Sequence, residues 1–268
     1  MKKTLLLFAA VSLIGFNSCE KKNSEEPGKI PGMGFTPGEL QIKERFVLPE
    51  GISLIGEIAG PEIPVAKGEL KPLLVYDSKA SVPRYGSGCV VRLKLTVCNT
   101  RGNPRTVFFP KGLIFKCITG DFQDGLCCQT FWVTLAPNEK RTTEIELYCT
   151  KKDVPTPTYD GKFAIWGVTD SKVLWDLLSK IGWKKINFNW IYENVLNKGT
   201  MAEGPTYEEI TLRLQTMVHN LTNNGISISA EDESFLNSIP ELAPEFRPVV
   251  DENSKYPEYF EEFLVPGK

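Results

Sequence analysis

The chain has 268 residues, of which 41% are hydrophobic and 24% are charged, and its formal net charge at pH 7 is -2. This composition holds enough apolar material for one large domain or two small ones, and it argues against a chain that is disordered throughout. The small negative charge, with no run of lysines and arginines, argues against nucleic acid or an anionic membrane surface as a ligand.

The first 18 residues have the features of an export signal. The chain opens with MKK, and the apolar run LLLFAAVSLIG that follows is shorter than the roughly 20 residues that a membrane-spanning helix needs. A positive start followed by a short apolar run is typical of secretory signals. We therefore predict that residues 1–18 are a signal peptide.

The residues FNSC, which end at Cys19, resemble the lipobox of bacterial lipoproteins in the relaxed form used by Bacteroidetes. Phe16 and Ser18 stand where the strict lipobox has leucine and then alanine or glycine. The resemblance implies that Cys19 carries a lipid and begins the mature chain. It also implies an outer-membrane lipoprotein, on the cell surface or on the periplasmic face. The alternative is ordinary signal cleavage nearby, with Cys19 lost or incidental.

Residues 19–38 are polar at first and then rich in glycine and proline. Such a segment lacks the apolar surface that folding requires, so we expect a flexible tether between the lipid and the folded domain. Its Glu25-Glu26 pair resembles the acidic export signal of lipoproteins that reach the outer face of the cell, although a solvated linker explains the two acids equally well.

Residues 39–168 show the two-residue alternation of β-strands. The segments LQIKERFVL and ISLIGEI place apolar residues on one parity, and CVVRLKLTVCN alternates valine and leucine with arginine, lysine and threonine. The turn NTRGNP precedes the apolar stretch TVFFPKGLIFKCI. FWVTL and EIELYC, joined by APNEKR, have the signature of a β-hairpin. Short strands without interleaved helices predict an antiparallel β-sandwich.

Two family resemblances concern this β-rich region. VRLKLTVCNTRGNPRTVFFPKGLIF resembles immunoglobulin-like bacterial modules, which implies an immunoglobulin-like sandwich. LYCTKK and KFAIWGVTD are similar to the paired motifs of thioester adhesin domains, in which a cysteine is joined to a glutamine. Cys149 and Ala164-Ile165-Trp166 match, but Lys162 stands where the glutamine should be, so no Cys–Gln thioester can form. This resemblance implies at most a related scaffold with Trp166 as a core anchor.

Beyond residue 168 the apolar period changes to that of helices, and we predict a helical region over residues 169–240. SKVLWDLLSKIGW carries an apolar stripe, with Ser171 or Asp170 as the N-cap and an end near Gly182. NWIYENVLNKG is a shorter candidate helix.

The best helix candidate is PTYEEITLRLQTMVHNLTNNG, in which Thr206 and Glu209 form a capping box. Ser229 and Asp232 are predicted to open one more short helix. Residues 241–268 combine prolines, acids and aromatic residues, and we expect this tail to pack back across the surface in extended form.

The single histidine, His219, lies about opposite the apolar stripe of its predicted helix, so we expect it to face solvent. A Ser/His/Asp triad, a Cys/His dyad or a histidine-based zinc site needs a histidine that a second group positions. Neither a glycine-rich phosphate loop nor HExxH occurs. We therefore predict no catalytic residue, no cofactor and no metal site.

An even number of cysteines follows Cys19, which in an exported protein suggests disulfides. Parity points Cys89 and Cys149 toward the core and Cys98 outward, while Cys117 could bridge a hairpin to either member of the pair CC. The alternative is that several are buried free thiols, which behave as small hydrophobes. No CxxC pair occurs, so a tetrathiolate metal site is not expected. The candidate disulfide cysteines are Cys89, Cys98, Cys117, Cys127, Cys128 and Cys149.

A candidate ligand-binding rim consists of Asp121, Phe122, Asp124 and Trp132. The first three share one loop, and Trp132 lies on the outer face of a nearby predicted strand. Paired acids could support glycoside hydrolysis, and acids beside aromatic rings also suit a sugar or a peptide. The alternative is that aspartate and glycine only make the turn.

These features together predict a lipid-anchored cell-envelope protein that is more a binding, adhesion or assembly module than an enzyme. Its expected partners are the membrane, through the lipid, and a surface protein or glycan, with no nucleic acid. The other candidates are a hydrolase that acts on glycan or peptide with carboxylates alone, and covalent adhesion through Cys149.

Overall fold

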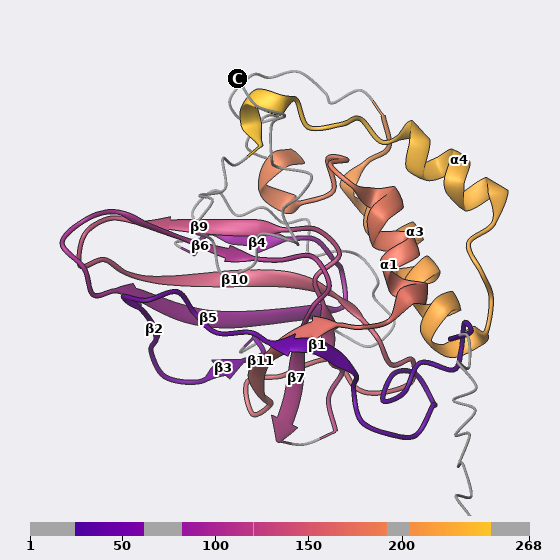
Figure 1. Ribbon diagram of the computed structural model, residues 1–268, viewed down its shortest axis with the longest axis horizontal. Coiled ribbons are helices and arrows are strands. Elements are labelled where there is room, and N and C mark those ends of the chain that lie inside the picture. The colour runs from indigo at the N-terminus through magenta and orange to yellow at the C-terminus, as the bar shows by residue number, and fades with distance from the viewer. Residues whose placement is uncertain (1–24, 62–81, 120, 192–203, 248–268) are drawn as a thin grey trace, which may run out of the picture.

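The computed structural model describes residues 25–61, 82–119, 121–191 and 204–247. Strands dominate, with a strand-rich body at one end of the long axis and helices at the other (Figure 1). The prediction of a mainly β chain with helices in its C-terminal part is confirmed.

The strands are β1 (Ile42–Arg45), β2 (Ile52–Leu54), β3 (Ile58–Ala59), β4 (Arg84–Gly86), β5 (Val91–Asn99), β6 (Arg105–Phe109), β7 (Leu113–Thr119), β8 (Gly125–Leu126), β9 (Phe131–Leu135), β10 (Lys140–Cys149) and β11 (Lys162–Thr169). The helices are α1 (Lys172–Ile181), α3 (Tyr207–His219), a π-helical turn (Asn220–Asn224), α4 (Ala230–Ser238) and a 3-10 turn (Pro244–Phe246).

Six strands close into an antiparallel barrel in the order β5, β3, β11, β7, β8 and β10. The ring closes because β10 pairs with β5 in a long ladder that runs from Lys140 opposite Cys98 to Leu147 opposite Val91. Three further strands attach to this ring: β1 pairs with β11, β2 pairs with β5, and β4 runs parallel to β10. The alternation predicted for CVVRLKLTVCN is confirmed, since the apolar residues of β5 are buried inside the barrel.

The hairpin that we predicted between FWVTL and EIELYC is wrong. These segments are β9 and β10, but β9 pairs with β6 in a separate two-stranded sheet, whereas β10 pairs with β5. The turn from β5 to β6 and the turn from β9 to β10 therefore each connect the barrel to the two-stranded sheet. They are bound to each other, because the Asn138 amide donates to the Arg101 carbonyl (3.1 Å) and the Asn99 amide to the Glu139 carbonyl (2.8 Å).

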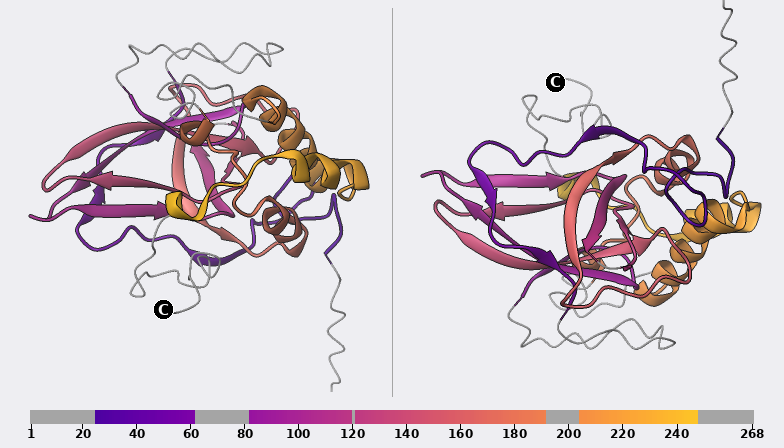
Figure 2. Two further views of the ribbon diagram at one scale, coloured as in Figure 1. Left: turned by 90° about the horizontal axis from the view of Figure 1, so that it is seen from above. Right: turned by 90° about the horizontal axis from the view of Figure 1, so that it is seen from below.

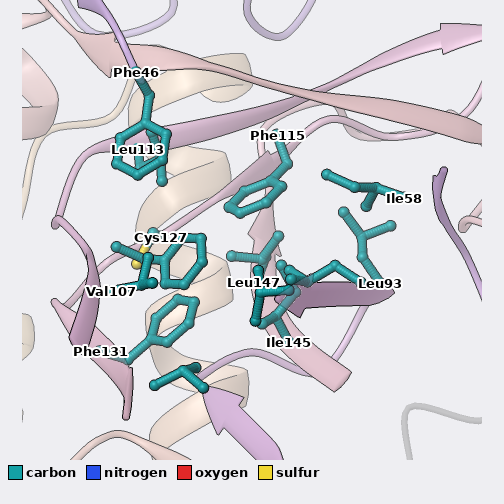
Figure 3. Close-up of a cluster of buried hydrophobic side chains, with 14 of the residues drawn as sticks. Phe46, Ile58, Leu93, Val107, Leu113, Phe115, Cys127, Phe131, Ile145 and Leu147 are labelled. Carbon is teal, nitrogen blue, oxygen red and sulfur yellow. The ribbon is translucent and has the colours of Figure 1, made fainter. Parts of the chain in front are cut away.

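The two-stranded sheet packs over the barrel and shares its apolar core (Figure 3). The rings of Phe109 and Phe131 stack with centroids 4.7 Å apart, and Phe46 stacks on Phe109 at 5.8 Å. This shared core is the physical reason that β9 pairs with β6 and not with β10. Pairing with β6 lets both strands bury one face against the barrel.

The predicted helix boundaries are confirmed by the capping residues. The Ser171 hydroxyl caps α1 by accepting from the Leu174 amide (3.2 Å), and α1 ends at Gly182, whose φ is positive. Thr206 opens α3 with the predicted capping box, and Ser229 opens α4 with a second one. NWIYENVLNKG falls mostly outside the described residues.

Helix α3 is bound to the outside of the barrel by polar contacts. The Gln215 side chain accepts from the Cys149 amide and donates to the Cys149 carbonyl, both at 2.9 Å. The Tyr207 hydroxyl donates to the Glu146 carboxylate at 2.6 Å. Glu146 is buried and also accepts from Arg92 (2.8 Å), so its charge is compensated.

The N-terminal segment differs from our expectation. Residues 25–38, which we expected to belong to a flexible tether, pack against the helices and the barrel. Ile30 and Met33 are buried together with Leu40 in the core between the helices and the barrel. The physical reason is that Ile30, Met33 and Leu40, although separated by glycines and prolines, bury their apolar side chains between the helices and the barrel.

The start of the C-terminal tail packs back as predicted. The Leu242 amide donates to the Trp183 carbonyl (2.8 Å), the Lys185 amide donates to the Pro240 carbonyl (2.7 Å), and Leu242 is buried. Residues 248–268 of the predicted tail lie outside the described residues.

Candidate functional site

The two aspartates of the predicted rim differ in their surroundings. Asp124 is buried, and its carboxylate accepts from the Cys117 amide (2.8 Å) and pairs with the Lys151 ammonium (3.1 Å). Asp121 is exposed. A carboxylate that is already bound to an amide and an ammonium inside the protein has a structural role, so the pair does not offer two accessible acids.

The aromatic residues of the predicted rim belong to different parts of the fold. Phe122 packs against the barrel core, next to Gly161. Trp132 is half-buried in β9, and its ring contacts are Trp190 (5.2 Å between centroids) and Phe108 (6.3 Å). Within the described residues, the structure shows no contact that joins these side chains into one rim.

All six described cysteines are free thiols in the structure, and their disulfide pairing stays a prediction. Cys127, Cys128 and Cys149 are buried. Burial raises the pKa of the Cys127 and Cys149 thiols to about 12, so both are protonated at neutral pH. A buried, protonated thiol is a poor nucleophile, which leaves little support for covalent adhesion through Cys149.

The thioester-like residues are not brought together. Cys149 ends β10 and Lys162 begins β11, and two strands separate β10 from β11 in either direction around the barrel, β8 and β7 on one side and β5 and β3 on the other. The Lys162 ammonium pairs with Glu57 (2.7 Å). Trp166, the expected core anchor, is half-buried and packs from outside the barrel against the core between the helices and the barrel.

The expectation that His219 faces solvent is also wrong. The side chain is half-buried, and its Nε2 is inaccessible and without a hydrogen-bond partner among the described residues. Burial, with a smaller effect of the Lys152 charge, lowers its pKa. The turn that contains Lys152 lies against the π-helical turn that follows α3, where the Lys152 amide donates to the Asn223 side chain (3.0 Å).

One set of described residues that combines exposed positive charge with aromatic rings lies where β1, β11, β7 and α1 meet. Here two tryptophans are each approached by two basic side chains. We call this set the basic aromatic surface, and it consists of Lys43, Arg45, Lys111, Lys116, Trp166 and Trp175.

The geometry around Trp166 is the tightest. The Arg45 guanidinium carbon lies 3.4 Å from the centre of the Trp166 ring, and the Lys116 ammonium lies 4.3 Å from it. Antiparallel pairing places β1 and β7 on either side of β11, which brings these cations to one ring. Stacking on the ring orders the cations, because the ring face attracts positive charge.

The second ring, Trp175, is held in place by its own polar atom. Its Nε1 donates to the Thr169 carbonyl (2.8 Å), and the ammonium groups of Lys43 and Lys111 lie 6.0 and 5.7 Å from the ring centre. Lys43 and Arg45 are exposed, Lys116 is half-buried, and Lys111 is buried.

Two acids near this face, Glu44 and Glu25, are directed or bound elsewhere. Glu44 separates Lys43 from Arg45 in the sequence, and strand alternation turns it toward the other side of β1. Glu25 is engaged at the start of α1, where its carboxylate accepts from the Ser171 hydroxyl (2.9 Å) and the Val173 amide (3.2 Å). The basic aromatic surface therefore contains four basic side chains, of which Lys43 and Arg45 are exposed.

Sequence reasoning missed this surface. Its six members span positions 43 to 175, and they come together only when β1 and β7 flank β11. The available signal was the alternation KER in β1, which places Lys43 and Arg45 on one face.

Within the described part of the chain, no group of three or more histidine, cysteine or acidic residues could hold a metal ion. None of the helices in that part is long and apolar enough to cross a bilayer. No protein-family model, curated protein or solved structure matches the chain.

Proposed function

We propose that the protein is a lipid-anchored cell-envelope protein that binds a partner bearing carboxylate, sulfate or phosphate groups. The basic aromatic surface is the observation that carries this proposal. Lys43 and Arg45 are exposed and Lys116 is half-buried, so the positive charge of this surface lies at or near solvent. Stacking of Arg45 and Lys116 on Trp166 limits the side-chain entropy that binding would otherwise cost.

The contact between Arg45 and the Trp166 ring indicates which kind of ligand this surface would bind. A sugar that stacks on tryptophan needs a free ring face, but the guanidinium of Arg45 lies directly on Trp166. The cations are therefore the groups that meet the ligand, which favours an anionic polymer over a neutral glycan. The expected surface protein or glycan partner is then one that is acidic.

Binding is favoured over hydrolysis by the state of the carboxylates. The Asp124 carboxylate is bound to the Lys151 ammonium and to the Cys117 amide. This arrangement does not support the hypothesis of a hydrolase that uses Asp121 and Asp124.

Two further parts of the proposal rest on the sequence. The lipobox-like FNSC supports a lipid on Cys19 and an outer-membrane location. The resemblance of VRLKLTVCNTRGNPRTVFFPKGLIF to immunoglobulin-like modules supports an immunoglobulin-like sandwich, and the packing of the β6/β9 sheet on the barrel over one apolar core is compatible with a two-layered fold.

The binding test uses the full-length protein purified in detergent and four labelled probes. Polygalacturonate, dextran sulfate and polyglutamate are anionic, and dextran is the neutral control. We expect binding to at least one anionic probe that weakens as salt is raised, because salt screens exposed charges. The glycan and peptide probes distinguish the two kinds of partner.

The matched variants replace equal numbers of basic residues. Arg45→Ala with Lys116→Ala should weaken binding roughly tenfold, or about 1.4 kcal/mol, which is of the order of two exposed charge contacts. Lys94→Ala with Lys140→Ala, exposed on other barrel strands, should leave the affinity unchanged. Equal affinity of both double variants for an anionic probe, or no binding of any probe, contradicts the proposal.

A further inference from the structure

The folded chain begins much closer to Cys19 than a tether through residue 38 would allow. The Glu25 carboxylate is bound to the start of α1, and the Gly28 amide donates to the Leu221 carbonyl (2.7 Å). The Gly34 amide donates to the Thr150 carbonyl (2.9 Å). From Cys19 to Glu25 the chain advances six positions, which reach about 20 Å when fully extended.

Two exposed apolar side chains adjoin the contact between this N-terminal segment and the end of the π-helical turn. A methyl group on Gly28 would lie 2.8 Å from the Gly225 Cα, so the two backbones touch. Phe35 follows Gly34 in one segment and is 69% exposed, and Ile226 follows Gly225 in the other and is 52% exposed. We call Phe35, Ile226 and this contact the anchor-proximal end.

A single exposed apolar side chain is ordinary, but these two share one place in the fold. Phe35 is the most exposed of the large hydrophobic residues described. The acid beside them, Glu26, is paired with Lys29 (2.7 Å), which reduces the cost of bringing this end to a membrane. A large aromatic side chain next to a paired charge suits the boundary between headgroups and acyl chains.

We propose that the anchor-proximal end lies in the interfacial layer of the membrane, with Phe35 and Ile226 inserted at the headgroup boundary. This inference rests on the proposed lipid on Cys19, which would hold this end within about 20 Å of the bilayer. The domain would then stand with its long axis away from the membrane. The turns that join β5 to β6 and β9 to β10, at the opposite end in Figure 1, would point outward.

The basic aromatic surface is close to the path of the N-terminal segment. Figure 2 shows the indigo N-terminal segment running from the helical end along the barrel, and β1, which carries Lys43 and Arg45, lies between the helices and the outer turns in Figure 1. A partner could reach it from the side while the domain is docked.

The test places a tryptophan at the predicted depth in full-length, lipid-bearing protein reconstituted in vesicles with bromine-labelled acyl chains. Bromine quenches tryptophan fluorescence only at short range. The variants are Phe35→Trp and, as the matched control, Phe246→Trp, whose phenylalanine is 48% exposed elsewhere on the surface. Relative to the unaltered protein, we expect the added fluorescence to be quenched in Phe35→Trp and not in Phe246→Trp.

Equal and unquenched fluorescence of the two variants overturns the inference. Shielding of the new tryptophan without quenching, in a protein that sediments as a dimer, also overturns it, because a second copy would then cover this end. The mass of the N-terminal peptide separates the two proposals. A lipid on Cys19 without quenching refutes only membrane docking, whereas an unmodified Cys19 refutes the proposed anchor and this inference together.

Discussion

Replacing Met33 by alanine tests whether the N-terminal segment belongs to the fold. Met33 is 0% exposed and packs with Ile30 and Leu40 in the core between the helices and the barrel. Truncation removes about three methylene-sized groups at about 0.8 kcal/mol each, and the cavity left behind adds to this loss. We expect the free energy of unfolding to fall by about 2–5 kcal/mol.

The assay is urea unfolding followed by tryptophan fluorescence, with the slope of the transition compared between proteins. Phe35→Ala is the matched control, because it lies in the same segment but is exposed, and it should change the stability by less than about 0.5 kcal/mol. If Met33→Ala is as mild as Phe35→Ala, the segment is a tether after all and the packing described above is wrong.

Three further predictions use the same unfolding assay or a simple chemical probe. Tyr207→Phe removes a hydrogen bond to the charged Glu146 and should cost about 1.5–3 kcal/mol; a loss below about 0.5 kcal/mol contradicts the contact. The Cys127 thiol, with its pKa raised to about 12 by burial, should resist alkylation at pH 8 until urea unfolds the protein, and rapid labelling of the folded protein would show that it is accessible. Burial, with a smaller effect of the Lys152 charge, lowers the pKa of His219 when folded, so the unfolded chain takes up its proton first and stability should fall as pH drops below about 6.5. His219→Gln should reduce that fall, and an unchanged pH profile in the variant contradicts the assignment.

The helices could be predicted because their signals are local. Ser171, Thr206 and Ser229 each cap a helix through an amide three residues ahead, so a short stretch of sequence contains both partners. The alternating burial of β5 could be predicted for the same reason, since neighbouring residues on one strand face opposite sides.

The strand partners could not be predicted, because they depend on which faces meet in the core. The turn after β9 looks like a hairpin turn, yet Phe131 stacks on Phe109 of β6 and thereby draws β9 away from β10. Burial of Ile30 and Met33 was missed because their neighbours are glycine and proline, which favour an extended linker when read without the helices that cover them.

The sequence and the structure point to different candidate sites. The sequence drew attention to Asp124 because it shares a loop with another acid, and only its contact with Lys151 shows that it is structural. Arg45 and Lys116 gave no joint signal, because β11 lies between their strands in the sheet but far from both in the sequence.

The most direct test of the whole account is co-sedimentation with membranes from cells that produce one of three proteins, using the labelled anionic probe that the purified protein binds. These are the unaltered chain, the Arg45→Ala/Lys116→Ala variant and Cys19→Ala, each quantified by blotting. We predict that only the unaltered protein carries extra probe into the membrane pellet. The surface variant should sediment without the probe, and Cys19→Ala should leave the pellet. Equal probe in all three pellets would contradict both the binding surface and the lipid anchor.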